Sequence, residues 1–357
     1  MTRADAPPPA APPPVYHLCP GVLHIHTTYS DGTGRVPDVA RAAKRAGLRW
    51  IIITDHDDLR AGAEAGWHDG VAVLAGYEIT PERNHYLVCG LEELIPNTLP
   101  PAEYVRLVAE KGGLGFVAHP DERVTNEYTR PFRWDDWNLR GFTGIELWNY
   151  MSEWIERYSP RRRYVNYFLP QFVVRGPTPA TLAWWDRLAV EGWRPTGVVG
   201  ADVHATRVRA LGRVWEVFPY EHVFRALTDY LVLDSPLEAD FAGAAAQILG
   251  ALRAGRVIMA NRTWGEAAGT RFEAHLPDGR RFTVGDEVPA EGPVALLFQA
   301  PRKAHITLYR DGTPVARVRG ERALWFTAHE PGHYRAEARR WGQLWILTNH
   351  IHVGRTR

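Results

Sequence analysis

Short apolar runs rich in β-branched residues alternate with amphipathic segments along residues 22–260. Apolar side chains recur with helical spacing at about 36–46, 101–111 and 240–254, so we expect helices there. The apolar runs predict strands, at 22–27, 50–54, 71–75, 86–89, 114–118, 144–148, 197–200 and 256–260. This alternation predicts a mostly parallel sheet, open or closed.

Polar side chains fall at the carboxyl ends of several predicted strands. His26, His56, Glu78, His119 and Asp202 all occupy such positions. In a βα barrel the carboxyl ends of the strands form one rim, where catalytic groups gather. The position of these residues therefore favours a barrel with its site at that rim.

Histidine spacing adds chemistry to this rim. On a strand, His24 and His26 project to the same face, and Asp31 follows in the next loop. Imidazole and carboxylate together suit zinc, manganese or iron, although an isolated pair of surface histidines is commonly just solvated. The barrel region offers nine potential ligands: His24, His26, Asp31, His56, Glu78, His85, His119, Asp202 and His204. Nine are enough for two or three divalent ions, a centre suited to hydrolysis.

The last ninety or so residues have a different pattern, in which short alternating runs are separated by turn sequences such as P-D-G-R and R-D-G-T. This pattern predicts hairpins and a small antiparallel sandwich. We expect a disordered proline-rich leader at 1–17, a barrel at 18–262 with a rim insertion at 121–195, and the sandwich at 263–357.

Composition excludes few classes. Lys and Arg total 42 against 41 Asp and Glu, so no overall basic field points to nucleic acid. The two cysteines, Cys19 and Cys89, fit a reducing cytoplasm, and no apolar run reaches transmembrane length. We expect a cytoplasmic protein with a small-molecule substrate and no nucleic-acid or membrane partner. The oligomeric state is left open.

Six motifs occur in the order found in the polymerase-and-histidinol-phosphatase (PHP) superfamily, which the chain resembles over roughly residues 18–260. They are H-I-H-T-T-Y-S-D-G from His24, I-T-D-H-D from Ile53, G-Y-E from Gly76, H-Y-L-V-C-G from His85, A-H-P from Ala118 and G-A-D-V-H from Gly200. The resemblance implies an α/β fold, a distorted (β/α)7 TIM-like barrel, and manganese, iron or zinc bound by all nine residues. In such proteins a glutamate like Glu78 bridges two metals, and most members hydrolyse phosphoesters.

On this basis we expect a metal-dependent hydrolase, in which a hydroxide bridging two or three ions attacks a small phosphate ester. His119 or His204 would protonate the leaving group. An orienting role for His85 and His119 beside the true ligands is an alternative. One ion would be held by His24, His26, Glu78 and Asp202, and its neighbours by Asp31, His56, Glu78 and His119 with His85 or His204.

Substrate contacts are expected elsewhere on the rim. Arg207 and Arg209, just after His204, are placed to meet an anion. Glu146 and Asn149 stand where many PHP members carry a further His or Cys ligand, and Asn149 is a candidate substrate contact. The tryptophans of the insertion form either an aromatic substrate wall or a packed core with a solvated run of arginines.

The C-terminal segment suggests a second possible reaction. The runs P-G-H-Y-R-A-E from Pro331 and W-I-L-T-N from Trp345 resemble the PHP branch that includes carbaryl hydrolases, which cleave carbamate esters. Cleavage of a carbamate, ester or amide is therefore an alternative, and a noncatalytic metal-stabilised scaffold is a third. For the terminal His350 and His352 we expect a closing strand with exposed imidazoles.

Overall fold

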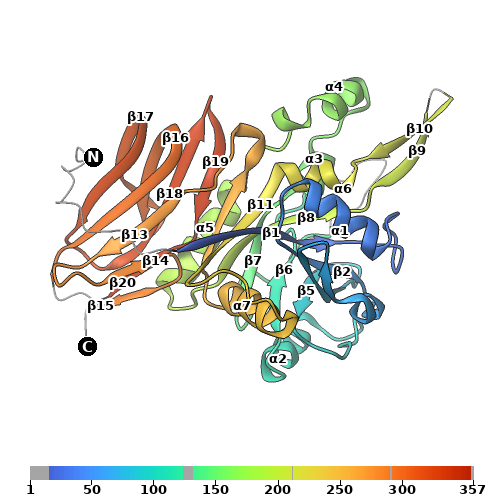
Figure 1. Ribbon diagram of the computed structural model, residues 1–357, viewed down its shortest axis with the longest axis horizontal. Coiled ribbons are helices and arrows are strands. Elements are labelled where there is room, and N and C mark those ends of the chain that lie inside the picture. Colours follow the sequence, from blue (N-terminus) through green and yellow to red (C-terminus); the bar gives the residue numbers. More distant parts are fainter. Residues whose placement is uncertain (1–15, 124–131, 211, 290–291, 355–357) are drawn as a thin grey trace.

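A computed structural model describes residues 16–123, 132–210, 212–289 and 292–354. Seven strands close into a barrel by pairing in sequence around a ring (Figure 1). They are β1 (His17–Ile25), β2 (Trp50–His56), β4 (Val71–Ile79), β5 (Tyr86–Cys89), β6 (Leu114–Val117), β7 (Gly144–Asn149) and β8 (Thr196–Val203). The α/β class and the closed barrel are thus confirmed.

The barrel departs from regular βα alternation at one place. β5 runs antiparallel to both of its neighbours, β4 and β6, whereas the other neighbouring pairs are parallel. The connection between β4 and β5 consists of residues 80–85, which is too short for the crossover that a parallel pair requires. A short strand, β3 (Gly66–His68), also pairs with β4.

The three predicted helices are present as α1 (Val36–Arg45), α2 (Pro101–Glu110) and α7 (Phe241–Arg253). α1 follows the expected pattern closely, with a proline in its first turn and Val36, Val39 and Ala43 buried. The remaining helices are α3 (Tyr150–Glu156), α4 (Arg163–Phe168), α5 (Pro179–Val190) and α6 (Tyr220–Ala226), with short 3-10 turns at Arg60–Glu64, Pro160–Arg162, Pro170–Phe172 and Arg262–Trp264. No helix in the described part of the chain is long and apolar enough to cross a bilayer.

The insertion between β6 and β8 packs several of its tryptophans inward. Trp134, Trp148 and Trp154 are buried in the main core, while Arg161 and its two arginine neighbours are exposed. For these tryptophans the structure supports the packed-core alternative over the substrate wall. Beyond β8, a separate two-stranded hairpin is formed by β9 (Thr206–Ala210) and β10 (Arg213–Val217).

The first barrel strand is shared with an antiparallel sheet. The first half of β1 pairs with β11 (Leu227–Leu233), β11 pairs with β12 (Val257–Asn261), and β12 pairs with β19. A second hydrophobic core forms under this sheet and includes residues of β11 and β12. The strand pairing therefore joins residues on both sides of position 262/263, where the sequence predicts a domain boundary. That boundary stays a prediction.

The C-terminal strands are long and mostly antiparallel, as the turn sequences predict. Runs predicted as separate strands merge, because β16 and β17 continue through irregular pairing near Gln299 and Ala304. The strands are β13 (Arg271–His275), β14 (Arg281–Thr283), β15 (Glu287–Pro289), β16 (Val294–Arg310), β17 (Thr313–Ala328), β18 (Gly332–Arg340), β19 (Gln343–Thr348) and β20 (Ile351–Gly354). Their arrangement as a sandwich stays a prediction.

The expectation of exposed terminal imidazoles is wrong. His350 and His352 are 3% and 7% exposed, with His352 in the closing strand β20. His350 Nε2 lies 2.9 Å from Asp186 Oδ1 of α5, and His352 Nδ1 lies 2.7 Å from His333 Nδ1. These partners give the buried rings the hydrogen bonds that burial requires.

Candidate metal centre

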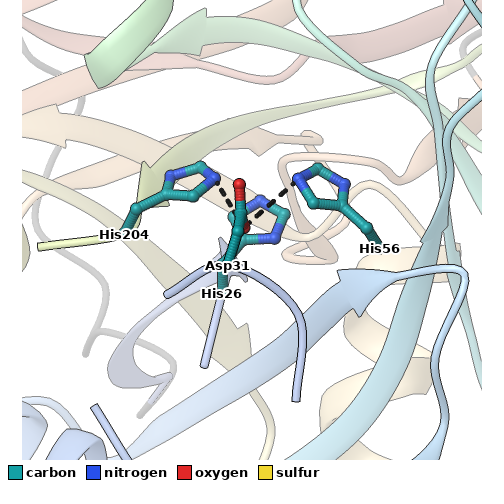
Figure 2. A group of neighbouring side chains, drawn as sticks. All are labelled: His26, Asp31, His56 and His204. Atoms are coloured by element: carbon teal, nitrogen blue, oxygen red, sulfur yellow. Dashed lines mark ion pairs between the residues drawn. The ribbon is translucent and has the colours of Figure 1, made fainter. Parts of the chain in front are cut away.

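The nine candidate ligands meet at one rim of the barrel, formed by the carboxyl ends of the parallel strands and the amino end of the antiparallel β5. His24 lies in β1, His56 ends β2, Glu78 lies in β4 and Asp202 lies in β8. The others come from the loops next to β1, β5, β6 and β8: His26, Asp31, His85, His119 and His204. Figure 2 shows four of these side chains, with His56 and His204 directed toward Asp31 from two other strand ends and His26 beside it.

Ligand atoms of these residues form four overlapping groups, in each of which the atoms lie within 4.8 Å of one another. The groups are His26, Asp31, His56 and His204; His24, His26 and Glu78; His24, His119 and Asp202; and Glu78, His85 and His119. All nine predicted residues belong to at least one group. The structure thus brings the whole set together, while the role of each as a ligand stays a prediction.

Glu78 lies between the groups. Its Oε2 is 3.0 Å from His56 Nδ1 and 3.3 Å from His24 Nε2, and its Oε1 is 2.9 Å from His85 Nδ1 and 3.5 Å from His119 Nε2. Burial alone would raise the pKa of Glu78, but the surrounding histidines outweigh it and hold that pKa well below its usual range. An ionised carboxylate whose two oxygens face different histidine rings could serve as a metal ligand, and the bridging role of Glu78 stays a prediction.

Buried atoms without hydrogen-bond partners test whether metal ions fit here. Within the described residues, both ring nitrogens of His26, Nε2 of His24, Nδ1 of His56, Nδ1 of His119 and Oε2 of Glu78 are such atoms. Leaving so many buried polar atoms unpaired is costly. Divalent cations would satisfy them, and the mixed imidazole and carboxylate set suits zinc, manganese or iron. The residues present therefore fit a metal centre.

Glu146 contacts two of the candidate ligands without being one of the nine. Its Oε1 lies 2.7 Å from His24 Nδ1, and its Oε2 accepts hydrogen bonds from the backbone N–H of His119 at 2.7 Å and from Asn149 Nδ2 at 2.9 Å. A Cβ added at Gly200 would lie 1.3 Å from Glu146 Oε1, so only glycine leaves room for the carboxylate. In this position Glu146 fixes which nitrogen of His24 faces the other ligands.

Asp55 organises the loop that carries Asp31. Its carboxylate accepts hydrogen bonds from the backbone N–H and the hydroxyl of Thr27, each at 2.7 Å, and from Ser30 Oγ at 2.5 Å. The sequence motifs did not predict this role for Asp55. The available signal was a carboxylate directly before His56 at the end of an apolar strand.

The backbone is strained at three candidate ligands. His24, His119 and Asp202 have φ angles of 65°, 25° and 50°, a region that residues other than glycine seldom adopt. The pairing of β1 with β8 shifts register between Leu23 and Ile25, and β1 ends at Ile25 rather than continuing as predicted. Such strain clusters at functional sites, where the surrounding fold holds it in place.

Comparison with known proteins agrees with the family resemblance of the sequence motifs. Residues 23–123 match the family model of the PHP domain. Seven of the nine candidate ligands lie in this matched segment, and Asp202 and His204 lie beyond it. The comparisons support the PHP superfamily.

Two curated relatives match the same part of the chain. An uncharacterized protein of Methanocaldococcus jannaschii is 35% identical over 113 residues, which cover 28% of this chain and 66% of the relative. Phosphoribosyl 1,2-cyclic phosphate 1,2-diphosphodiesterase of Eggerthella lenta is 36% identical over 83 residues, which cover 21% of this chain and 32% of that enzyme. The chain thus spans just under two thirds of the first relative and about a third of the second.

Solved structures share the architecture only loosely. A two-domain protein from Bacteroides vulgatus that contains a predicted PHP-like metal-dependent phosphoesterase has a TM-score of 0.46 at 14% identity, covering 94% of this chain and 96% of that one. An amidohydrolase from Chromobacterium violaceum has a TM-score of 0.33 at 14% identity, covering 56% of this chain and 92% of that one.

The two candidate acid residues of the site differ in exposure. His119 is buried, whereas the side chain of His204 is 20% exposed with Nε2 3.2 Å from Asp31 Oδ1. Burial would lower the pKa of both rings. Glu122 and Glu78 outweigh it and raise the pKa of His119 to about 10, and Asp31 and Asp202 raise the pKa of His204.

The predicted substrate contacts lie in two different environments. Arg207 and Arg209 are exposed on β9, shortly after the candidate ligand His204. Asn149 is buried, donates to Asp202 Oδ2 at 3.2 Å, and caps α3 by accepting from the N–H of Ser152. The roles of all three in substrate binding stay predictions.

Proposed function

We propose that the protein is a metal-dependent phosphoesterase that acts on a small phosphate ester. The observation that carries the proposal is the set of four overlapping ligand groups whose buried atoms lack hydrogen-bond partners. The match of residues 23–123 to the PHP domain and the diphosphodiesterase relative support the same reaction class. A bound cluster of two or three manganese, zinc or iron ions supplies Lewis acidity toward an ester oxygen and lowers the pKa of a coordinated water.

The residues of the chain have separate roles in metal binding, ligand orientation and proton donation. Glu78 and the surrounding imidazoles hold the cations, and Glu146 keeps His24 in one tautomer. His204 is the better placed proton donor for a leaving group, because its ring reaches solvent beside Asp31. His119, which is buried against Glu78, serves as a ligand in this account.

Cleavage of a carbamate, ester or amide is the second candidate. The pocket beside His119 is lined by several carboxylates, including Asp121, Glu122 and Glu153, with Arg157 as the one arginine among the described residues that line it. Such a lining repels an anionic phosphate more than a neutral carbonyl substrate. The resemblance of the tail to the carbaryl-hydrolase branch supports the same alternative.

Both cysteines are free and buried, which supports the proposed cytoplasmic location.

Hydrolysis of p-nitrophenyl phosphate, acetate and carbamate tests the proposal, because a common leaving group isolates the effect of the attacked centre. Metal-stripped protein and protein reloaded with manganese or zinc are assayed side by side. We expect turnover only after reloading, with the phosphate preferred. Preference for the carbonyl substrates would replace the phosphoesterase by the second candidate. Equal rates with and without metal would contradict both.

A further inference from the structure

An exposed surface that is both apolar and basic lies outside the metal centre. We define it as the exposed side chains of residues 161–172 and of residues 206–214 other than 210 and 211, from α4, the following 3-10 turn and the β9–β10 hairpin. Val165, Phe168 and Val214 are 57%, 60% and 59% exposed. Contiguous exposed apolar side chains of this size are uncommon on a soluble protein and mark an interaction site.

Contacts between α4 and the hairpin make this a single surface. The Tyr167 and Phe168 rings lie 5.7 Å and 6.2 Å from the Trp215 ring, and the Tyr167 hydroxyl donates to the backbone carbonyl of Glu216 at 3.0 Å. In Figure 1, α4 and the β9–β10 hairpin both extend beyond the body of the barrel.

The charged side chains within the two defined ranges are all arginines, while Glu216 of the same hairpin lies opposite Arg207. Neither range contains Asp or Glu. Among the described residues, none of its arginines forms an ion pair, and Arg163 stacks on the Tyr164 ring at 4.9 Å. These arginines are Arg161, Arg162, Arg163, Arg207, Arg209 and Arg213. Long cationic side chains beside exposed apolar ones are the arrangement of proteins that lie on anionic membranes.

We propose that this surface docks the protein on an anionic lipid bilayer, independently of the reaction at the metal centre. Phe168, Val165 and Val214 would enter the headgroup region, while the guanidinium groups bind lipid phosphates. A second copy is the poorer partner, because a two-fold contact through this surface would set arginine against arginine. Docking would also bring lipid close to the metal centre, since β9 begins two residues after His204.

Co-sedimentation of the full chain with vesicles tests the proposal. Vesicles contain phosphatidylcholine alone or mixed with phosphatidylglycerol. We expect binding only to the mixed vesicles, with loss at high salt. The triple substitution Arg161→Glu, Arg162→Glu and Arg163→Glu should weaken binding at least about 100-fold, and Phe168→Ser should also weaken it.

Matched controls separate the surface from overall charge. Arg317→Glu, Arg319→Glu and Arg322→Glu make the same change on exposed β17, and Trp341→Ser removes an equally exposed aromatic ring. Both controls should keep wild-type vesicle binding. Absence of binding to the mixed vesicles, or equal losses in the β17 control, would overturn the proposal. Self-association that the Arg161–Arg163 substitutions abolish, without vesicle binding, would assign the surface to a second copy instead.

Discussion

At the scale of single residues, the site depends on a glycine as much as on its ligands. Gly200 leaves room for Glu146, whose carboxylate joins the His24 ring to the backbone of His119. Gly200→Ala should displace that carboxylate and free the His24 ring, weakening metal binding roughly 10–100-fold. Titration of metal-stripped protein with manganese measures this change directly.

The control for this substitution is Gly250→Ala in α7, where an added Cβ meets nothing within 4 Å. The control should keep wild-type metal affinity and gain slightly in helix stability. If Gly200→Ala binds manganese as tightly as the control, Glu146 does not orient His24.

Glu153 gives the protein a predictable pH response. Burial raises the pKa of this carboxyl to about 7, although the backbone N–H groups of Arg175 and Gly176 donate to it and oppose the shift. A raised pKa means that its contribution to folding is full below the unfolded value near 4.5 and is lost as pH rises through 7.

Glu153→Gln keeps this side chain neutral at every pH. Relative to wild type, the free energy of unfolding of the variant should rise by about 2–3 kcal/mol between pH 5 and pH 8. Urea unfolding of both proteins at the two pH values measures the difference. A constant difference would show that Glu153 does not change its protonation state in this range.

At the scale of elements, a buried ion pair joins α5 to the C-terminal strands. Arg335 Nε and Nη2 donate to the two oxygens of Asp186 at 2.8 and 2.9 Å, and His350 Nε2 contacts the same carboxylate. Burial would raise the pKa of Asp186, but His350 and Arg335 outweigh it and lower that pKa to about 2. The carboxylate is therefore charged at neutral pH and requires its partners.

Arg335→Met should destabilise the protein by about 3–5 kcal/mol, because it leaves Asp186 buried without its guanidinium partner and removes one of the two arginines beside Glu337. Chemical denaturation measures the loss, and Arg317→Met on exposed β17 should change stability by less than about 0.5 kcal/mol. Adding Asp186→Leu to Arg335→Met should recover part of the loss. Equal stability of the two single variants would show that the buried ion pair does not stabilise the protein.

The two H-x-H sequences show how far an element can be read from its own residues. His24 and His26 were correctly placed at the rim, because they follow an apolar barrel strand whose end must lie there. His350 and His352 have the same local pattern, yet the partner that buries His350 lies 164 residues away in α5. Only the tertiary fold reveals that contact.

At the scale of the whole molecule, sequence reasoning predicted the parts that depend on local pattern. The barrel strands, three helices and the convergence of nine polar residues follow from apolar runs and their ends. The antiparallel course of β5, the pairing of β1 with β11 and the place of Glu146 beneath His24 could not be predicted. Each depends on which strands meet across long stretches of chain.

The measurement that tests the central claim most directly is the metal content of the protein. Stripped wild-type protein is reloaded with manganese, freed of unbound ions and analysed for metal per chain, beside Glu78→Gln, which removes the carboxylate shared by two ligand groups. We predict two or more ions in the wild type and loss of this complement in a folded Glu78→Gln variant. A wild-type protein that retains no manganese, or a variant that retains the full complement, would contradict the account.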